Sequence, residues 1–355
     1  MKIISLFSGA GGLDLGFEKA GFETIWANEN DKNIIPTYKK NFKKTQLVEL
    51  SISDIDLGSI PDCDGIIGGP PCQSWSAAGS HRGIEDERGK LFLKEYVKII
   101  KEKKPQFFLA ENVPGIEYKK HENSFTEILE SLRSTGYNIS YKVYNTYDYG
   151  VAQTRKRLII VGYASGYDGF FKLEPYIGKK LNLKEVIYDL KDSVVPAIKR
   201  TKPNPKCKIL NHEYNNTPRD KNSFHYMSRN RVRGWDEGSF TIPATGRHVP
   251  QHPQAPKMIP KIDKKGKRVL NVMQFKPGFK RKYRRLSIRE CARIQGFPDK
   301  FEFIYDNVDH GYKMIGNAVP VKFAYLIAKQ IKKDMKRFDN IKKSFRKKGI
   351  IVKLD

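Results

Sequence analysis

The chain has 355 residues, of which 39% are hydrophobic and 30% charged, a balance typical of a globular protein and unlike that of a disordered chain. Its 66 Lys and Arg residues against 39 Asp and Glu give a net charge of +27, which favours a polyanionic partner, although a lysine-rich source proteome would give the same excess. The four cysteines lack the spacing of a zinc site, which predicts free thiols and no metal. The N-terminus reaches glycines too soon for a signal peptide, and no apolar run is long enough to span a membrane. We therefore expect a cytoplasmic protein without membrane contact.

Residues 1–162 alternate continuous apolar runs with amphipathic stretches. Continuous runs are what strands buried on both faces of a sheet require. The five strands predicted in this way are 3–7, 24–28, 64–69, 106–111 and 157–163. Between two of them, residues 89–103 repeat apolar side chains at helical spacing. The alternation of strands and helices predicts an α/β fold with a doubly wound, mostly parallel sheet.

A glycine-rich turn follows the first predicted strand, in the sequence LFSGAGGLDLGF at residues 6–17. Glycines there let the backbone pass close to a ligand. Glu29 lies twenty residues after Gly9, just past the second strand, where a carboxylate can accept hydrogen bonds from both ribose hydroxyls. The two features together favour a cofactor that carries a nucleoside. Asp54 is placed either to accept an adenine amino group or to cap a helix.

Cys72 follows the third predicted strand in the sequence GGPPCQSWS. The carboxyl edge of such a sheet is where these folds bind ligands, and Pro70 and Pro71 stiffen the loop that presents the thiol there. A cysteine is more often a small buried hydrophobic residue, but this setting favours a thiolate nucleophile.

Charged side chains end the next two strands at the same edge. Glu111 closes the strand in AENVPG, and a carboxyl group beside a nucleophile can protonate the molecule that is attacked. Arg155 and Arg157, in QTRKRLIIVG, are placed to point toward the crevice or toward phosphate. The sequence therefore predicts one site that contains a thiol, a carboxyl group and guanidinium groups.

After about residue 165 the pattern becomes irregular, which predicts a second, smaller domain. Residues 257–289 contain thirteen Lys and Arg residues and one acid, which favours contact with phosphate over a merely solvated surface. Ser287 and Glu290 have the spacing of a capping box, and Gly296 fits the end of the helix that they begin.

The last helix is predicted to begin near Pro320, and its spare apolar face predicts that it packs back on the first domain. The predicted division is residues 1–190 plus 308–355 as the catalytic and cofactor-binding domain, and 191–307 as the domain that recognises the target.

These motifs, taken together and in order, resemble the DNA (cytosine-5) methyltransferase family over nearly the whole chain. The matching stretches are FSGAGGLDLGF, Glu29, Asp54, GGPPCQSWS, AENV, QTRKR, RRLSIRECARIQGFP and GYKMIGNAVP. The resemblance implies the Rossmann-like fold of methyltransferases that use S-adenosyl-L-methionine, with a smaller irregular target-recognition domain. Residues 227–258 resemble the recognition region of GGCC-specific, HaeIII-type modification methyltransferases, which implies methylation of the inner cytosine.

The resemblance also implies a role for each site residue. Cys72 would add to C6 of a cytosine flipped out of the duplex, Glu111 would bind N3 and the exocyclic amine, and Arg157 would hold O2, with Arg155 supporting the loop. The residues implied to bind S-adenosyl-L-methionine are Phe7, Gly9, Gly11, Leu13, Glu29, Asn30, Asp54, Ile55, Pro70, Leu91 and Asn317. The residues implied to bind DNA are Gln73, Ser76, Arg229, Arg231 and Arg247.

The expected partner is double-stranded DNA, bound by a monomer that protects its site in a restriction-modification system, with a cognate endonuclease acting on the same site without needing contact. Two alternatives stay open at this point. A tRNA cytosine-5 methyltransferase shares the fold, but CQSWS and the length of the recognition region favour DNA. A catalytically silent DNA-binding relative is disfavoured by the intact Cys72, Glu111 and Arg157.

Overall fold

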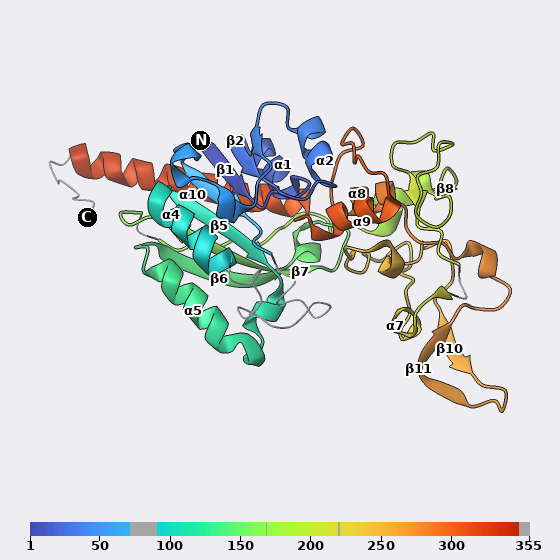
Figure 1. The fold of residues 1–355 in the computed structure, drawn as a ribbon. Helices are drawn as coiled ribbons and strands as arrows, with labels where there is room; N and C mark the ends of the chain where they lie inside the picture. Colours follow the sequence, from blue (N-terminus) through green and yellow to red (C-terminus); the bar gives the residue numbers. More distant parts are fainter. Residues whose placement is uncertain (72–90, 168, 219–220, 348–355) are drawn as a thin grey trace.

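A seven-stranded sheet forms the centre of the protein, whose computed structural model describes residues 1–71, 91–167, 169–218 and 221–347 (Figure 1). The order of its strands is β3-β2-β1-β4-β5-β7-β6. In chain order they are β1 (Lys2–Leu6), β2 (Glu23–Asn28), β3 (Gln46–Val48), β4 (Gly65–Gly68), β5 (Phe107–Asn112), β6 (Asn138–Asn145) and β7 (Lys156–Tyr163). β7 is antiparallel to both of its neighbours, and the remaining pairs of the sheet are parallel. The mostly parallel sheet is confirmed.

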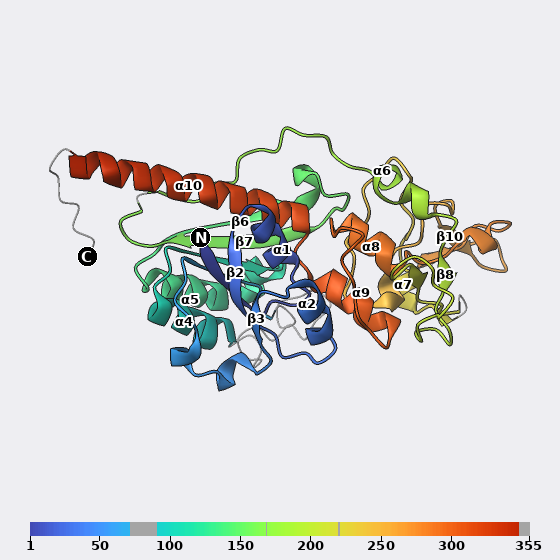
Figure 2. The ribbon, with the colours of Figure 1, turned by 90° about the horizontal axis from the view of Figure 1, so that it is seen from above.

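Helices cover both faces of the sheet, which confirms the doubly wound α/β prediction (Figure 2). They are α1 (Gly12–Lys19), α4 (Val97–Lys103), α5 (Glu122–Arg133) and α10 (Val321–Lys347). Successive side chains of a strand point to opposite faces. Phe107 and Ile159 accordingly pack in the apolar core beneath α1 and α10, and Phe108 and Ile160 pack in the core beneath α4 and α5. Each internal strand is therefore buried on both faces, as its continuous apolar sequence requires.

The long helix α10 packs across α1, as its spare apolar face predicts. The two helices approach so closely that a Cβ atom at Gly16 would lie 2.4 Å from Cβ of Ala324, which leaves room only for glycine. Among the residues that the structure describes, no helix is long and apolar enough to cross a membrane.

Two strands of the sheet, β3 and β6, were not predicted from the sequence. β3 has only three residues, and β6 carries half-buried and exposed side chains along most of its length at the edge of the sheet. Neither strand contains the continuous apolar run that identified the others. The five predicted strands all form, and no strand end differs from the prediction by more than one residue.

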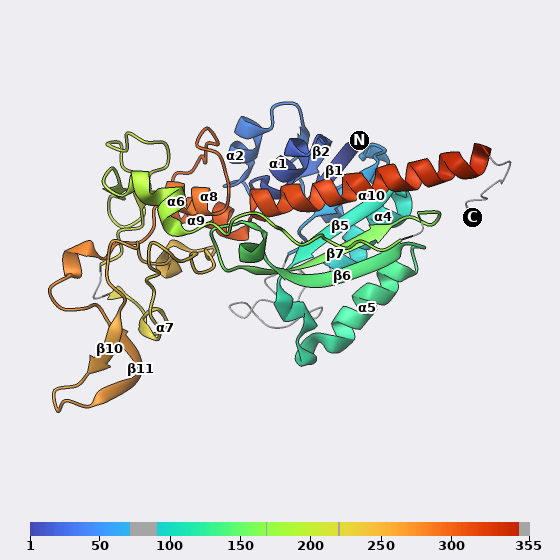
Figure 3. The same ribbon diagram turned by 180° about the vertical axis from the view of Figure 1, so that it is seen from behind.

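The second part of the chain contains few regular elements, as predicted. The first part of the chain also contains the short helix α2 (Ile35–Asn41). The elements of the second part are α6 (Leu183–Ile187), α7 (Phe224–Met227), α8 (Ile288–Ile294), α9 (Val308–Asn317), β8 (Val195–Pro196), β9 (Glu213–Tyr214), β10 (Ile259–Ile262) and β11 (Arg268–Gln274). The antiparallel β10–β11 hairpin projects away from the central sheet, at the opposite end of the molecule from the C-terminal end of α10 (Figures 1 and 3). The division of the chain into two domains at residues 190 and 308 stays a prediction.

Helix α8 begins with the capping box predicted from the sequence. The backbone N–H of Glu290 donates to Oγ of Ser287 at 3.0 Å, and the N–H of Ser287 donates to Oε2 of Glu290 at 2.8 Å. Gly296 follows the helix with a φ of 83°, in the left-handed region that favours glycine at a helix end.

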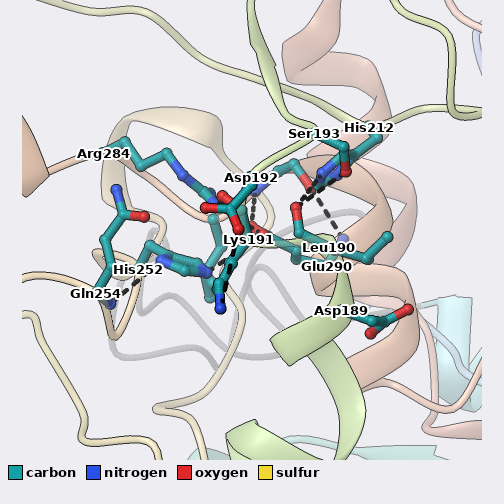
Figure 4. Close-up of polar contacts among 12 residues, drawn as sticks. Asp189, Leu190, Lys191, Asp192, Ser193, His212, His252, Gln254, Arg284 and Glu290 are labelled. Carbon is teal, nitrogen blue, oxygen red and sulfur yellow. Dashed lines mark hydrogen bonds and ion pairs between the residues drawn. The ribbon is translucent and has the colours of Figure 1, made fainter.

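The capping carboxylate of Glu290 is also the centre of a buried polar cluster (Figure 4). Arg284 donates to both of its oxygens, at 2.8 and 2.7 Å, and Nε2 of His252 lies 3.4 Å from Oε1. Although burial alone would raise it, the charge of Arg284 lowers the pKa of Glu290 to about 2. Burial lowers the pKa of His252 to about 3, so this imidazole is neutral at pH 7.

Candidate active site

A cavity of about 360 Å³ opens at the carboxyl ends of the central strands β1, β2, β4 and β5. This is the edge at which doubly wound folds bind ligands. The predicted cofactor residues that line it are Phe7, Gly9, Leu13, Glu29, Asn30, Pro70, Leu91 and Asn317. Three others, Gly11, Asp54 and Ile55, are described but do not line the cavity.

The glycine turn and Glu29 form one hydrogen-bonded unit in the lining of this cavity. The backbone N–H of Gly9 donates to Oε2 of Glu29 at 2.9 Å, and the N–H of Asp31 donates to Oε1 at 2.8 Å. Gly9 has a φ of 57°, and a Cβ atom there would have no neighbour within 4 Å, so the turn faces open space. Burial raises the pKa of Glu29, although both backbone bonds oppose the shift.

Gly11 has a structural role in addition to the cofactor contact implied by the resemblance, which stays a prediction. It is the N-cap of α1, with a φ of 80°, and a Cβ atom there would lie 2.2 Å from the ring of Phe42. The structure therefore requires glycine for backbone conformation and packing at this position.

The cavity is also lined by residues that the sequence analysis did not select. Ser51 and Ile52 line it, and Asp54 lies at the end of the same 3-10 turn, Ile52–Asp54. Asp54 is therefore close in sequence to two lining residues, and its contact with the adenine amino group stays a prediction.

The remaining wall of the cavity comes from α9 and the residues that follow it. Lys313 and Met314 line it together with Asn317, and Nζ of Lys313 lies 2.6 Å from Oδ2 of Asp31. This ion pair joins α9 to the loop after β2. Lys313 lies four residues before Asn317 on α9, so both side chains lie on one face of this helix, which the sequence analysis did not predict.

Glu111 lines the cavity and forms an ion pair with Arg157. Nε of Arg157 lies 2.7 Å from Oε1 of Glu111, and both side chains are about nine-tenths buried, at 12% and 10% exposure. Glu111 comes from the end of β5 and Arg157 from the start of its antiparallel neighbour β7, where the register pairs Glu111 with Ile159. Sheet geometry thus brings the two predicted catalytic groups together.

The Gly-Gly-Pro-Pro segment runs directly past this ion pair. A Cβ atom at Gly69 would lie 3.3 Å from Oε2 of Glu111, and Nδ2 of Asn112 donates to the carbonyl of Pro70 at 3.4 Å. The end of β5 therefore holds the chain just before Cys72. Cys72 itself, and the predicted DNA-binding residues Gln73 and Ser76, lie outside the described residues.

Arg155, the other predicted catalytic arginine, lies in the interior. Its side chain is 1% exposed, with Nη1 donating to the carbonyl of Ile242 at 3.3 Å. Nη2 donates to the carbonyls of Gly316 and Ala318 at 2.8 and 3.1 Å. The guanidinium group therefore binds backbone carbonyls of the loop at Ile242 and of the end of α9.

The three arginines predicted to contact DNA are placed in two different ways. Arg229 and Arg247 are exposed. Arg231 is buried, donates to the carbonyls of Tyr226 and His225 at 2.7 Å each, and stacks over the ring of Tyr226. In this conformation the guanidinium group of Arg231 is bound to the protein backbone and does not extend into solvent.

The basic run divides in a similar way. Its exposed members are Lys257, Lys261, Lys264, Lys265, Lys267, Arg268, Lys276, Lys280, Arg281 and Lys282. They gather on and around the β10–β11 hairpin. The other three, Arg284, Arg285 and Arg289, are buried and bonded within the protein.

Comparisons with known proteins agree with these features. A family model described as C-5 cytosine-specific DNA methylase matches residues 1–333. The chain is 51% identical over 354 residues to the Type II methyltransferase M.FnuDI of Fusobacterium nucleatum, covering 99% of each chain. It is 50% identical over 344 residues to the Type II methyltransferase M.NgoPII of Neisseria gonorrhoeae, covering 95% of this chain and 97% of that one.

Solved structures share the fold at lower sequence identity. The methyltransferase EhMeth of Entamoeba histolytica superposes with a TM-score of 0.67 at 18% identity, covering 94% of this chain and 98% of that one. The Dnmt2 methyltransferase of S. pombe superposes with a TM-score of 0.62 at 18% identity, covering 96% and 99%.

Proposed function

The chain belongs to the C-5 cytosine-specific DNA methylase family and is a DNA cytosine-5 methyltransferase. We propose that its substrate is the inner cytosine of GGCC, flipped out of duplex DNA. The methyl donor in this proposal is S-adenosyl-L-methionine. The observation that carries the proposed site is the Glu111 and Arg157 ion pair, which lies beside the segment leading to Cys72.

The chemistry of the cavity fits S-adenosyl-L-methionine. Glu29 presents a carboxylate for the ribose hydroxyls, and the open turn at Gly9 leaves room for a ligand against the backbone. Ser51 and Ile52 line the end at which the base would lie, and Asn317 lines the wall from α9. S-adenosyl-L-methionine supplies the methyl group when it is bound.

The protein groups make C5 of cytosine reactive. Addition of the Cys72 thiolate forms a bond between sulfur and C6 and moves the electron pair of the C5–C6 double bond to C5, which becomes the nucleophile. Glu111 binds N3 and the exocyclic amine, which favours this addition, and Arg157 holds O2. After transfer, C5 loses its proton and the sulfur–C6 bond breaks, which restores the thiolate and the aromatic base.

The base reaches these groups only after it leaves the duplex, so base flipping is part of the proposal. The exposed Arg229 and Arg247 are the candidates for reading guanine, because arginine can donate two hydrogen bonds to O6 and N7 in the major groove. The exposed lysines and arginines of the β10–β11 hairpin are suited to hold the phosphate backbone. Gln73 and Ser76 would follow the flipped nucleotide on the loop after Cys72.

The alternatives weighed from the sequence lose support. The family description names DNA, which disfavours the tRNA methyltransferase, and relatives at about 50% identity over nearly the whole chain are methyltransferases, which disfavours a silent DNA-binding protein. The relatives are Type II enzymes, so we infer that this protein protects its site from a cognate endonuclease. We further propose that it acts as a monomer. In this proposal residues 1–190 and 308–355 form the catalytic and cofactor-binding domain, and residues 191–307 form the target-recognition domain.

Bisulfite sequencing of plasmid DNA from cells that express the protein tests the proposed function. We expect 5-methylcytosine at the inner cytosine of GGCC and resistance of that plasmid to a nuclease that cuts GGCC. Methylation mainly at other sites would refute the GGCC assignment and leave the cytosine-5 chemistry standing. A plasmid without 5-methylcytosine, from cells that contain the folded protein, would refute the activity as well.

A further inference from the structure

Two buried glutamines and one buried arginine lie where the recognition part of the chain meets the cofactor cavity. Gln153 precedes β7, Gln295 follows α8, and both side chains are 0% exposed. Arg155 lies two residues after Gln153, just before β7, and is 1% exposed. A buried amide that lacks partners destabilises a protein, so the partners of these side chains show what they hold together.

The two glutamines form a continuous chain of hydrogen bonds. The backbone N–H of Ile242 donates to Oε1 of Gln153 at 2.7 Å, and Nε2 of Gln153 donates to Oε1 of Gln295 at 2.9 Å. Nε2 of Gln295 then donates to the carbonyls of Ile315 and Ala318, at 2.8 and 3.3 Å. Because an N–H lies at one end and two carbonyls at the other, only one orientation of each amide satisfies every group.

The bonds at the second end add to a backbone cap, in which the N–H of Ala318 donates to the carbonyl of Ile315 at 3.2 Å. The final carbonyls of a helix have no partner inside the helix, and α9 ends at Asn317 with Ala318 in extended conformation, not in a left-handed glycine cap. Gln295 binds the carbonyl of Ile315, and Arg155 binds those of Gly316 and Ala318. The positive charge of Arg155 also complements the negative end of the helix dipole.

The same side chains reach the recognition segment, residues 239–246. The N–H of Ile242 donates to Gln153, and the carbonyl of Ile242 accepts a hydrogen bond from Nη1 of Arg155 at 3.3 Å. A Cβ atom at Gly316 would lie 2.4 Å from the backbone of Pro243, so this segment packs directly on the end of α9. The segment continues into the turn Gly246–His248, which carries the exposed Arg247.

The opposite side of the same helix end forms the wall of the cofactor cavity. Asn317, Ala318 and Val319 all line the cavity. The last turn of α9 is therefore held between the recognition segment and the cofactor cavity, and its carbonyls are fixed by Gln295 and Arg155. A satisfied buried network of this kind specifies one geometry, which apolar packing alone does less strictly.

We propose that Gln153, Gln295 and Arg155 are positioning residues that set the cofactor-cavity wall, residues 317–319, relative to the recognition segment. This inference rests on the proposed function, because it takes the cavity to be the S-adenosyl-L-methionine site. Loss of the Gln153/Gln295 contact leaves Arg155 as the remaining side-chain link of this network between the recognition segment and the end of α9, so the cavity wall is held less strictly. Cofactor affinity then falls although neither glutamine lines the cavity.

The test compares Gln295→Met with Tyr163→Phe in the full chain. Methionine keeps the size of glutamine and removes its hydrogen bonds. Tyr163 lies at the other end of β7, where its hydroxyl donates to Oδ2 of Asp334 at 2.7 Å in an equally buried setting. Calorimetry with S-adenosylhomocysteine measures the dissociation constant, and urea denaturation measures stability for each protein.

We expect Gln295→Met to raise the dissociation constant about tenfold or more, and Tyr163→Phe to change it less than twofold at a similar loss of stability. Gln153→Met should also raise the dissociation constant. The variant with both substitutions should bind S-adenosylhomocysteine no more weakly than the single variant with the higher dissociation constant, because the two side chains form one chain of bonds. If Gln295→Met does not fold, Gln153→Met carries the same expectation.

Three results would overturn the inference. The folded glutamine variants could bind S-adenosylhomocysteine within twofold of wild type, Tyr163→Phe could weaken binding equally, or both glutamine variants could unfold while Tyr163→Phe folds. The last two would mean that the glutamines support the fold in general. Failure of the wild-type protein to bind S-adenosylhomocysteine would instead refute the proposed cofactor, which separates the two failures.

Discussion

Replacement of Glu29 by alanine removes the carboxylate that we assign to the ribose of the cofactor. In the structure this carboxylate already accepts the backbone N–H groups of Gly9 and Asp31, and its oxygens can accept further hydrogen bonds from a ligand. A hydrogen bond to a charged group contributes about 1.5–3 kcal/mol. Loss of one or more such bonds should therefore raise the dissociation constant of S-adenosylhomocysteine about 10- to 150-fold.

Glu29→Gln separates the ligand contact from the shape of the turn. Glutamine keeps the length of the side chain and one acceptor oxygen, but its amide places a donor against the N–H of either Gly9 or Asp31. We expect its dissociation constant to lie between those of wild type and Glu29→Ala. Glu23→Ala is the matched control, because Glu23 is exposed at the other end of the same strand, β2.

Isothermal titration calorimetry of the three variants gives the comparison directly. If Glu29→Ala binds S-adenosylhomocysteine within threefold of wild type, Glu29 does not hold the ribose. If Glu23→Ala weakens binding as much as Glu29→Ala, the effect arises from the strand and the assignment fails in the same way.

Three further predictions concern the ion pair, the helix contact and the buried histidine. Arg157→Met removes the guanidinium group that we assign to O2 of the cytosine and leaves the nearly buried Glu111 carboxylate without its partner. Removal of one preorganised donor typically lowers kcat about 100- to 1000-fold. In a labelled-methyl transfer assay kcat should therefore fall at least about 100-fold, and an unchanged kcat would contradict the site. Gly316→Ala places a Cβ atom 2.4 Å from backbone atoms and should lower stability to urea by about 1–3 kcal/mol, whereas the exposed turn variant Gly58→Ala, which meets only a flexible side chain, should change it by less than about 0.5 kcal/mol. His252 has a folded pKa of about 3, below its usual value of 6.5, so the unfolded chain binds the extra proton and stability from this residue is lost as pH falls below 6.5, by up to about 1.4 kcal/mol per pH unit. Urea denaturation should therefore show the stability advantage of wild type over His252→Asn shrinking from pH 6.5 to pH 4, and a constant advantage would contradict the burial of a neutral imidazole.

The strands that position the site could be predicted because burial on both faces leaves a direct mark on the sequence. β5 reads as a continuous apolar run that ends in Glu111, and the spacing of Gly9 and Glu29 follows from the length of one strand–helix–strand unit. β6 could not be predicted in this way, because an edge strand is buried less and its sequence mixes polar and apolar residues.

Residues whose partners are backbone groups were the hardest to interpret from the sequence. Arg231 lies in the segment that resembles a DNA-recognition region, yet its guanidinium group donates hydrogen bonds to the carbonyls of Tyr226 and His225. Every residue carries a carbonyl, so no sequence pattern marks such a partner. The Gln153/Gln295 contact is equally hidden, because it joins side chains 142 residues apart.

The most direct test of the proposed chemistry is covalent trapping by a GGCC duplex that carries 5-fluorocytosine at the inner position. Fluorine at C5 cannot leave as a proton does, so a protein that has added Cys72 to C6 and transferred the methyl group stays bound to the DNA. We predict a denaturant-stable complex of the wild-type protein that requires S-adenosyl-L-methionine, and none for Cys72→Ser. Equal trapping by the serine variant, or no trapping by a wild-type preparation that methylates ordinary GGCC duplex, would contradict the account.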